Sequence, residues 1–288
     1  MIARLRNPSL AIGVTIVIAI VVAAIAGPIL FRTDPLSIDL ANILAGPSRA
    51  HPFGCDALGR DVLARVLWGA RLSLSISTVV VAISLVVGSL IGATAALSGG
   101  RIDNLIMRGV DIVLAFPGIL LAIALAAILG PGLIDLTIAL TAMGWTGYAR
   151  IVRGEVLTLR EREYVLAAET LGANKSRLLM RHLLPGVVGP LAVQATFGIG
   201  GIIGAEAALS FLGLGALPPT PTWGNMLDAG RAFLLVAPHL TTAPGLAIGF
   251  SILGFNLLGD GIAQKVGYRT WVDVCGAAKF HDTHFDRK

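Results

Sequence analysis

The sequence predicts an all-α membrane protein with six transmembrane helices. Its mean hydropathy is +0.82, and 55% of its residues are hydrophobic while only 14% carry a charge. Soluble domains contain about 25% charged residues, so a chain this apolar cannot cover itself with a water-facing surface at 288 residues. Long uncharged runs indicate the same class, because about 20 apolar residues in a helix cross the hydrocarbon core of a bilayer.

The first two expected spans are long uncharged runs. Residues 10–30 contain no charge, and a helix of this length rises about 31 Å. Residues 72–97 form the second run. Arg4 and Arg6 before the first run, with small residues near its end, also outline a signal peptide. We expect an uncleaved first helix, because this run exceeds the apolar part of a signal peptide and leads into further spans.

Four more spans are expected along the rest of the chain. Residues 112–149 are interrupted by Gly130-Pro131-Gly132, which predicts a tight turn between a third and a fourth helix. Residues 186–217 and 232–259 supply the fifth and sixth spans, and Glu206 is the only charged residue within these two.

The segments between the spans differ in charge. Residues 1–9, 98–111, 149–185 and 260–288 lie on one side and hold 16 of the 22 Lys and Arg residues. Basic residues concentrate on the cytoplasmic side of membranes, so both termini are expected in the cytoplasm. The net charge of +5 is then a topology signal. No basic stripe with interleaved aromatic residues indicates nucleic acid as a partner.

Three regions are expected from these boundaries. Residues 1–71 contain the first span and a long outer loop, and 61–68 are predicted as a separate helix lying on the membrane, with apolar residues on one face. Residues 72–261 form a core of five spans. Residues 262–288 form a cytoplasmic tail whose role the sequence does not indicate.

The inner loop 149–185 has the most informative pattern. It is charged at first and amphipathic between Arg160 and Leu171. Gly172 can adopt the left-handed conformation that stops a helix. Asn174 can cap a second helix, which Pro185 ends or bends. The loop is either a solvated connector or a docking element for a cytoplasmic partner, and the small alanines beside the glycine turn favour docking.

This loop resembles the EAA loop of ABC-importer permeases, in which Glu-Ala-Ala is followed by a glycine and later by a Leu-Pro region. The matching positions are Ala167, Ala168, Gly172, Leu184 and Pro185. Leu166 stands where the family usually has Glu, so the contact made there is expected to be apolar.

Two further stretches resemble the dipeptide/oligopeptide/nickel-type permeases. One is His51-Pro52-Phe53-Gly54-Cys55-Asp56-Ala57-Leu58-Gly59-Arg60-Asp61-Val62, before the second span, and the other is Glu206-Ala207-Ala208-Leu209-Ser210-Phe211-Leu212-Gly213-Leu214-Gly215. With Phe255-Asn256-Leu257-Leu258-Gly259-Asp260-Gly261, the resemblance covers residues 2–261.

The resemblance implies a type I permease subunit of the bacterial inner membrane that forms half of a translocation pathway. It further implies a second related permease, two ATP-binding subunits, a solute-binding protein outside, and a coupling role for the loop residues named above. The chain contains no Gly-Lys pair and therefore no P-loop. We accordingly expect no enzymatic activity and no cofactor or metal in this chain, with ATP and Mg bound by partner subunits.

Alternatives stay open at this point. The cargo is expected to be dipeptides or oligopeptides, but the same machinery could carry a metal complex such as nickel. An ion-coupled secondary transporter would show internal repeats around charges at the midplane, and Glu206 is the one candidate. An intramembrane enzyme would need an acid, base or nucleophile pair, which the pattern does not indicate. Glu206 either forms hydrogen bonds in a tightly packed region or lines the pathway and meets the amino group of a peptide. It should not face lipid, where a charge costs about 2.5–3.5 kcal/mol.

Overall fold

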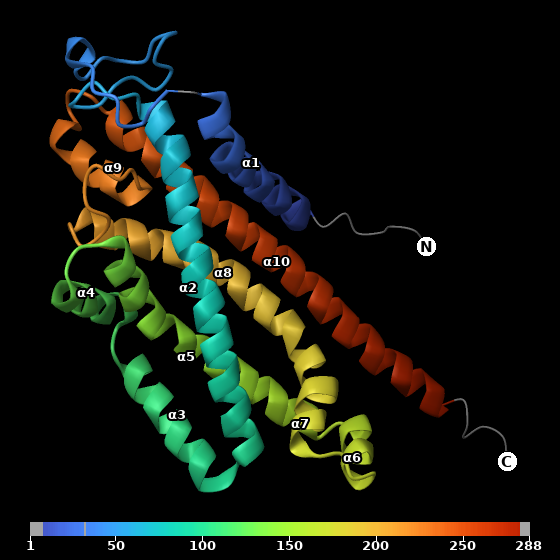
Figure 1. Cartoon of the computed structure of the whole chain (residues 1–288). Coiled ribbons are helices and arrows are strands. Elements are labelled where there is room, and N and C mark those ends of the chain that lie inside the picture. The colour runs from blue at the N-terminus through green and yellow to red at the C-terminus, as the bar shows by residue number, and fades with distance from the viewer. Residues whose placement is uncertain (1–7, 32, 283–288) are drawn as a thin grey trace.

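The computed structural model describes residues 8–31 and 33–282, and side chains only as far as Gly267. The described chain is mainly helical (Figure 1). Its long helices are α1 (Pro8–Leu30), α2 (Val62–Ser98), α5 (Leu133–Arg160), α8 (Leu184–Phe211) and α10 (His239–Asp282). Its shorter helices are α3 (Gly100–Ala115), α4 (Gly118–Leu129), α6 (Glu163–Thr170), α7 (Lys175–Leu178) and α9 (Trp223–Gly230). Short turns of 3-10 helix lie at Leu40–Asn42 and Arg231–Phe233, and a π turn lies at Leu179–Leu183.

Length and composition support four or five spans among the described residues, where six were expected. The four are Pro8–Leu30, Val62–Ser98, Lys175–Phe211 and His239–Gly267. The fifth is α3 and α4 taken together, which meet at 86°. The expected fourth span corresponds to α5, which has the length to cross a bilayer but falls outside this set because it is less apolar.

The bend between α3 and α4 was not anticipated, whereas the turn after α4 was. Phe116 has an extended backbone, because the ring of Pro117 disfavours a helical conformation in the residue before it. The tight turn at Gly130-Pro131-Gly132 is confirmed, since α4 ends at Leu129 and α5 begins at Leu133.

The expected interfacial helix at residues 61–68 is wrong as a separate element. Asp61 caps α2 by accepting a hydrogen bond from the amide of Ala64 at 2.8 Å, and the helix continues unbroken to Ser98. Gly69 does not break it. Its bare Cα instead lets Trp223 approach, since a Cβ there would lie 3.1 Å from the indole ring. The boundary expected at residues 71 and 72 therefore falls inside one helix.

Helices α2 and α5 pack through two glycines one turn apart. A Cβ at Gly88 would overlap the carbonyl oxygen of Trp145, and one at Gly92 would overlap that of Ala149. Small residues of this kind allow membrane helices to approach closely. This contact fixes α5 beside α2 near the end of the molecule that carries the inner loop.

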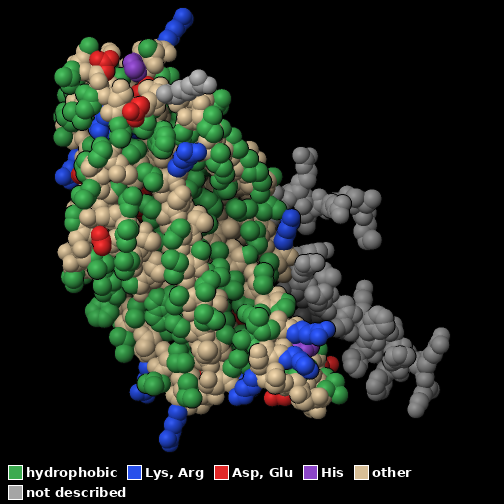
Figure 2. Space-filling model, in the orientation of Figure 1, with side chains coloured by type: hydrophobic (Ala, Val, Ile, Leu, Met, Phe, Trp, Pro, Cys, Tyr) green, Lys and Arg blue, Asp and Glu red, His purple; other side chains and the backbone are tan. Residues whose placement is uncertain are grey.

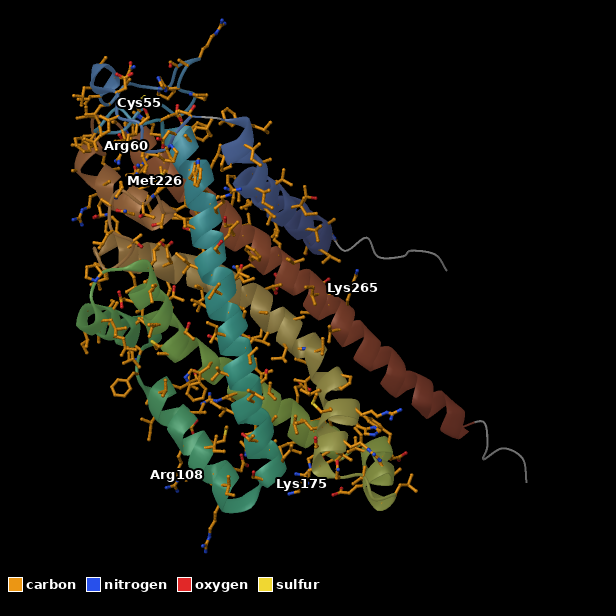
Figure 3. The ribbon with its side chains drawn as sticks, viewed as in Figure 1. Cys55, Arg60, Arg108, Lys175, Met226 and Lys265 are labelled. Atoms are coloured by element: carbon orange, nitrogen blue, oxygen red, sulfur yellow. The ribbon has the colours of Figure 1, made fainter. Side chains whose placement is uncertain are left out.

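The charged residues divide between two ends. Hydrophobic side chains cover most of the middle of the face in Figure 2, and charged side chains lie mainly toward the ends. Cys55 and Arg60 mark one end, and Arg108 and Lys175 mark the other (Figure 3). This separation agrees with the division of loops expected from the sequence.

The expected tail of residues 262–288 does not begin at a break in the chain. Helix α10 continues through residue 262 to Asp282. The last residues of the tail, and the side chains beyond Gly267, lie outside the described part of the chain.

Candidate functional site

The first candidate site is α6, which lies with α7 at the lower end of the molecule in Figure 1. Helix α5 ends at Arg160, and a short turn precedes Glu163. Val165 is fully buried and anchors α6 in a core that includes Tyr148, Val152 and Val187 from α5 and α8. The amphipathic pattern places Val165, Ala168 and Leu171 on one side of the helix. The structure buries Val165 and covers Ala168 partly, but it leaves Leu171 exposed.

The predicted coupling residues on α6 lie around this anchor. Leu166 is 48% exposed and Ala167 is exposed, while Ala168 packs partly against the same core. Tyr164 is also half exposed, and Leu171 is 89% exposed. Helix α6 therefore presents apolar side chains to solvent at the end of the molecule that carries Arg108 and Lys175. Exposed apolar side chains grouped in this way are typical of a surface that contacts another protein or a membrane.

Gly172 ends α6 as predicted. Its φ is +84°, in the left-handed region. Its amide donates to the carbonyl of Glu169 at 2.9 Å, and the amide of Ala173 donates to that of Ala168 at 3.0 Å. These two bonds form the Schellman arrangement that satisfies the last carbonyls of a helix. A Cβ at Gly172 would meet open space within this chain, so the backbone conformation is what favours glycine here.

The second half of the loop also follows the sequence closely. The side chain of Asn174 caps α7 by accepting a hydrogen bond from the amide of Arg177 at 2.8 Å, as predicted. Of the two alternatives for Pro185, ending the helix is wrong, because helical residues continue from the π turn into α8. Pro185 lies in the first turn of α8, directly after the π turn, where a missing amide proton costs least. Leu184 is half-buried and Pro185 is exposed.

Two basic residues have a role that charge counting did not reveal. Arg160 donates to the carbonyl of Ala96 at 3.0 Å, and Lys175 donates to that of Leu97 at 3.4 Å. Both carbonyls belong to the last turn of α2, where backbone acceptors have no partner within the helix. The loop on both sides of α6 is thus attached to the end of α2.

The second candidate, Glu206, is fully buried in α8. Ser73 of α2 donates to one carboxylate oxygen at 3.3 Å, and Ser210 donates to the other at 2.9 Å. The amide of Trp223, at the start of α9, donates to the hydroxyl of Ser73 at 3.4 Å. Glu206 therefore belongs to a polar cluster that joins α2, α8 and α9.

A cavity of about 510 Å³ lies beside this cluster, between the α3–α4 bend, α5 and α8. Phe116, Met143 and Ile202 are among the mainly apolar residues that line it. Ala205 lines the cavity, but Glu206 does not. This geometry favours the hydrogen-bonding hypothesis for Glu206 over contact with a passing solute.

This helical fold, in which the exposed helix α6 follows α5 and ends at a glycine, can be compared with known proteins. The family of binding-protein-dependent transport system inner membrane components matches residues 84–272. The chain belongs to this family. It is accordingly a permease component and not the ATPase subunit of a transporter. The match includes residues 262–272, so the start of the expected tail is part of the family region.

Named relatives cover nearly the whole permease. It is 42% identical to the dipeptide transport system permease protein DppC of Alkalihalophilus pseudofirmus over 91% of this chain and 86% of the relative. It is 44% identical to the glutathione transport system permease protein GsiD of Shigella dysenteriae over 91% and 87%. The GsiD protein of Escherichia coli is 43% identical over the same shares.

A solved structure has the same fold. It is a chain of the methionine ABC transporter MetNI in an inward-facing conformation, with a TM-score of 0.58 and 19% identity. The similarity covers 70% of the permease and 95% of that chain. This likeness confirms the expected ABC-importer permease fold.

Proposed function

We propose that this permease is one of two related membrane subunits of an ATP-driven importer whose cargo is dipeptides or oligopeptides. The observation that carries the proposal is the exposed helix α6, anchored by Val165 and ended by Gly172. Relatives named for dipeptide and glutathione transport, which match over 91% of the chain, favour peptides over a metal complex. The family match also favours this reading over an ion-coupled transporter, because members of the family work with a binding protein.

The proposed topology has six spans and two cytoplasmic termini. The sixth span, beyond those supported by length and composition, is α5, which packs against α2 and can carry more polar residues because neighbouring helices cover it. With Arg108 and Lys175 on the cytoplasmic side, residues 33–61 lie outside and α6 lies inside, at opposite ends of the molecule (Figure 1).

The proposed coupling passes through α6. Partner subunits bind ATP and Mg, and each receives such a helix in a groove, where Leu166 makes an apolar contact. Movement of α6 is transmitted to the end of α2 by the hydrogen bonds that Arg160 and Lys175 donate to it. A partner that binds one arrangement of these helices better than another shifts the population between inward-open and outward-open states. A solute-binding protein delivers cargo at the side of residues 33–61.

The test begins with purification of the permease with the chains that associate with it. We expect a second permease, two ATP-binding subunits, and ATPase activity that rises when peptide-loaded binding protein is added. Uptake of labelled dipeptide should persist when the proton gradient is collapsed, and nickel should not compete. Nickel uptake without peptide uptake would overturn the proposal that the cargo is peptides. Loss of dipeptide uptake when the proton gradient is collapsed would overturn the proposal that ATP drives transport.

Leu166→Glu tests the contact itself. We expect lower peptide-stimulated ATPase activity, because a carboxylate replaces an apolar contact. Asn104→Glu is the matched control, since it adds the same charge at an exposed position of α3, outside the loop that carries α6 and away from residues 33–61. Higher coupled activity in Leu166→Glu would mean that the partner offers a polar group at this point.

A further inference from the structure

An apolar groove of about 360 Å³ lies between α1, α2 and α10. Helix α1 touches α2 near Gly27, where a Cβ would lie 2.8 Å from the side chain of Leu67. It touches α10 near Ile16, whose side chain would lie 2.6 Å from a Cβ at Gly254. Between these two contacts Ala24 is buried against the body of the permease, while Ala19 and Ala23 line the groove. The groove is lined by Ile16, Ile20 and Ala23 of α1, Leu67 and Ala70 of α2, and Phe250 of α10, among others.

Water is a poor occupant of this groove. Its walls come from three helices that are long and apolar enough to cross the bilayer, and the lining side chains offer almost no hydrogen-bonding group. A water molecule needs two to four polar partners to be held in a protein cavity. An empty groove would forfeit the dispersion contacts of every lining side chain. An acyl chain needs no hydrogen-bonding partner and restores these dispersion contacts. The surrounding membrane supplies acyl chains at this surface.

One cation lies beside the groove. Arg71 follows the lining residue Ala70, and its guanidinium reaches across to α1, where it donates to the carbonyl of Ile25 at 3.4 Å. The same group lies over the ring of Trp68, 5.4 Å from its centre. The side chain is directed toward the start of α2, which is the direction in which a basic residue extends to reach the headgroup region. Tryptophan prefers the same depth.

Arg71 has no acidic partner among the residues that the structure describes. Arg60, Arg65, Arg150, Arg153 and Arg231 each lie within ion-pair distance of a carboxylate. A half-buried guanidinium within a membrane-spanning helix is stabilised by an anion. The phosphate of a phospholipid is the anion available at this depth, and basic sites between membrane helices bind lipid headgroups in this way.

We propose that the groove between α1, α2 and α10 is a binding site for an anionic phospholipid of the leaflet nearer residues 33–61. One acyl chain fills the groove, and the headgroup phosphate pairs with Arg71. The lipid completes the packing of α1 against the permease. The site is independent of the cargo and of α6.

The test uses the full chain in bilayer nanodiscs that contain equal amounts of phosphatidylglycerol and phosphatidylethanolamine, each spin-labelled in turn on its acyl chain. We expect an immobilised lipid fraction that is larger for phosphatidylglycerol. Arg71→Gln should lower this preference about fivefold, which corresponds to about 1 kcal/mol for one basic residue near the headgroups. Arg49→Gln, at an exposed loop position, is the control and should leave the preference unchanged.

Filling the groove separates acyl-chain binding from charge. Ala23→Phe, or Ala19→Phe if the first variant does not fold, should remove most of the immobilised fraction for both lipids. Ala11→Phe makes the same change at an exposed position of α1 outside the groove and should have no effect. An immobilised fraction that is equal in Ala23→Phe, Ala19→Phe and Ala11→Phe, or a preference unchanged by Arg71→Gln, would overturn the proposal. Both measurements are made without ATP or peptide, so a failure of the transport proposal cannot produce either result.

Discussion

Arg153 on α5 binds Asp103 on α3 through both carboxylate oxygens, at 2.6 and 2.7 Å. Asp103 is buried and Arg153 is partly covered. The pair holds the start of α3 against α5, at the end of the molecule that also carries α6. A two-point contact between a guanidinium and a carboxylate is stronger and more directional than a single hydrogen bond.

Asp103→Asn should lower the free energy of unfolding by about 1–3 kcal/mol, because the partly buried guanidinium loses its charged acceptor. The neighbouring pair Arg150–Asp111 is more than half exposed on both sides, so Asp111→Asn should cost less than about 1 kcal/mol. Denaturant unfolding of the purified permease in detergent measures both. Equal losses of unfolding free energy in the two variants would show that the buried pair stabilises the protein no more than the exposed pair does.

Gly92→Ala should also destabilise the chain, by about 1–3 kcal/mol, because the added methyl overlaps the carbonyl of Ala149 and forces α2 away from α5. Gly249→Ala adds the same methyl where it meets open space. There, the better helix propensity of alanine should make the change neutral or slightly stabilising. Thermal unfolding of the two variants compares them, and a stable Gly92→Ala protein would contradict the close contact.

Gly172→Val should impair coupling more than Gly172→Asn. A left-handed conformation costs a residue with a side chain about 1–2 kcal/mol, and asparagine adopts it more readily than valine does. We expect both variants to reach the membrane. Peptide-stimulated ATPase activity should fall strongly with valine and mildly with asparagine. Normal uptake in Gly172→Val would indicate that the loop is only a connector.

Glu206→Gln should preserve assembly and transport, because the amide can still accept a hydrogen bond from Ser73 or Ser210. Glu206→Leu leaves both hydroxyls without this partner and should cost about 1–3 kcal/mol. Protein yield, unfolding and peptide uptake are the measurements. If Glu206→Gln assembles normally but loses uptake of free-amine peptides more than of N-acetylated ones, Glu206 contacts the cargo.

Cys55 should resist thiol reagents while the protein is folded. Its side chain is buried, and burial raises the pKa of the thiol above its usual value, so less of the reactive thiolate exists at neutral pH. An impermeant maleimide should label Cys55 slowly in the folded protein and quickly after unfolding, and the slow folded-state reaction should become faster as the pH rises. Rapid labelling of Cys55 in the folded permease at neutral pH would contradict its burial.

The orientation of the chain is tested in a background without Cys55 and Cys275, the two cysteines of the sequence. Ser48→Cys and Ser176→Cys place single thiols at exposed positions at opposite ends. In intact cells, an impermeant reagent should label Ser48→Cys and spare Ser176→Cys. The reverse pattern would overturn the proposed topology.

The features that could be predicted from sequence depend on local physics. Uncharged runs such as residues 10–30 require a bilayer as solvent whatever their neighbours are. Gly172 and Asn174 end and begin helices through bonds to residues three to five positions away. The family resemblance needs only the order of motifs along the chain. These elements were accordingly found where they were expected.

Only the tertiary structure decided which distant groups meet. Arg160 binds a carbonyl 64 positions away, Lys175 one 78 positions away, and Ser73 a carboxylate 133 positions away. The periodicity of the sequence cannot predict such partners, because it is the packing of separate helices that brings them together. The same packing makes residues 62–68 part of α2, where Trp223 approaches Gly69. It also leaves Arg71, beside an apolar groove, without a carboxylate partner among the residues that the structure describes. The sequence determined that the chain belongs in a membrane, and the packing of its helices determined which polar groups find partners there.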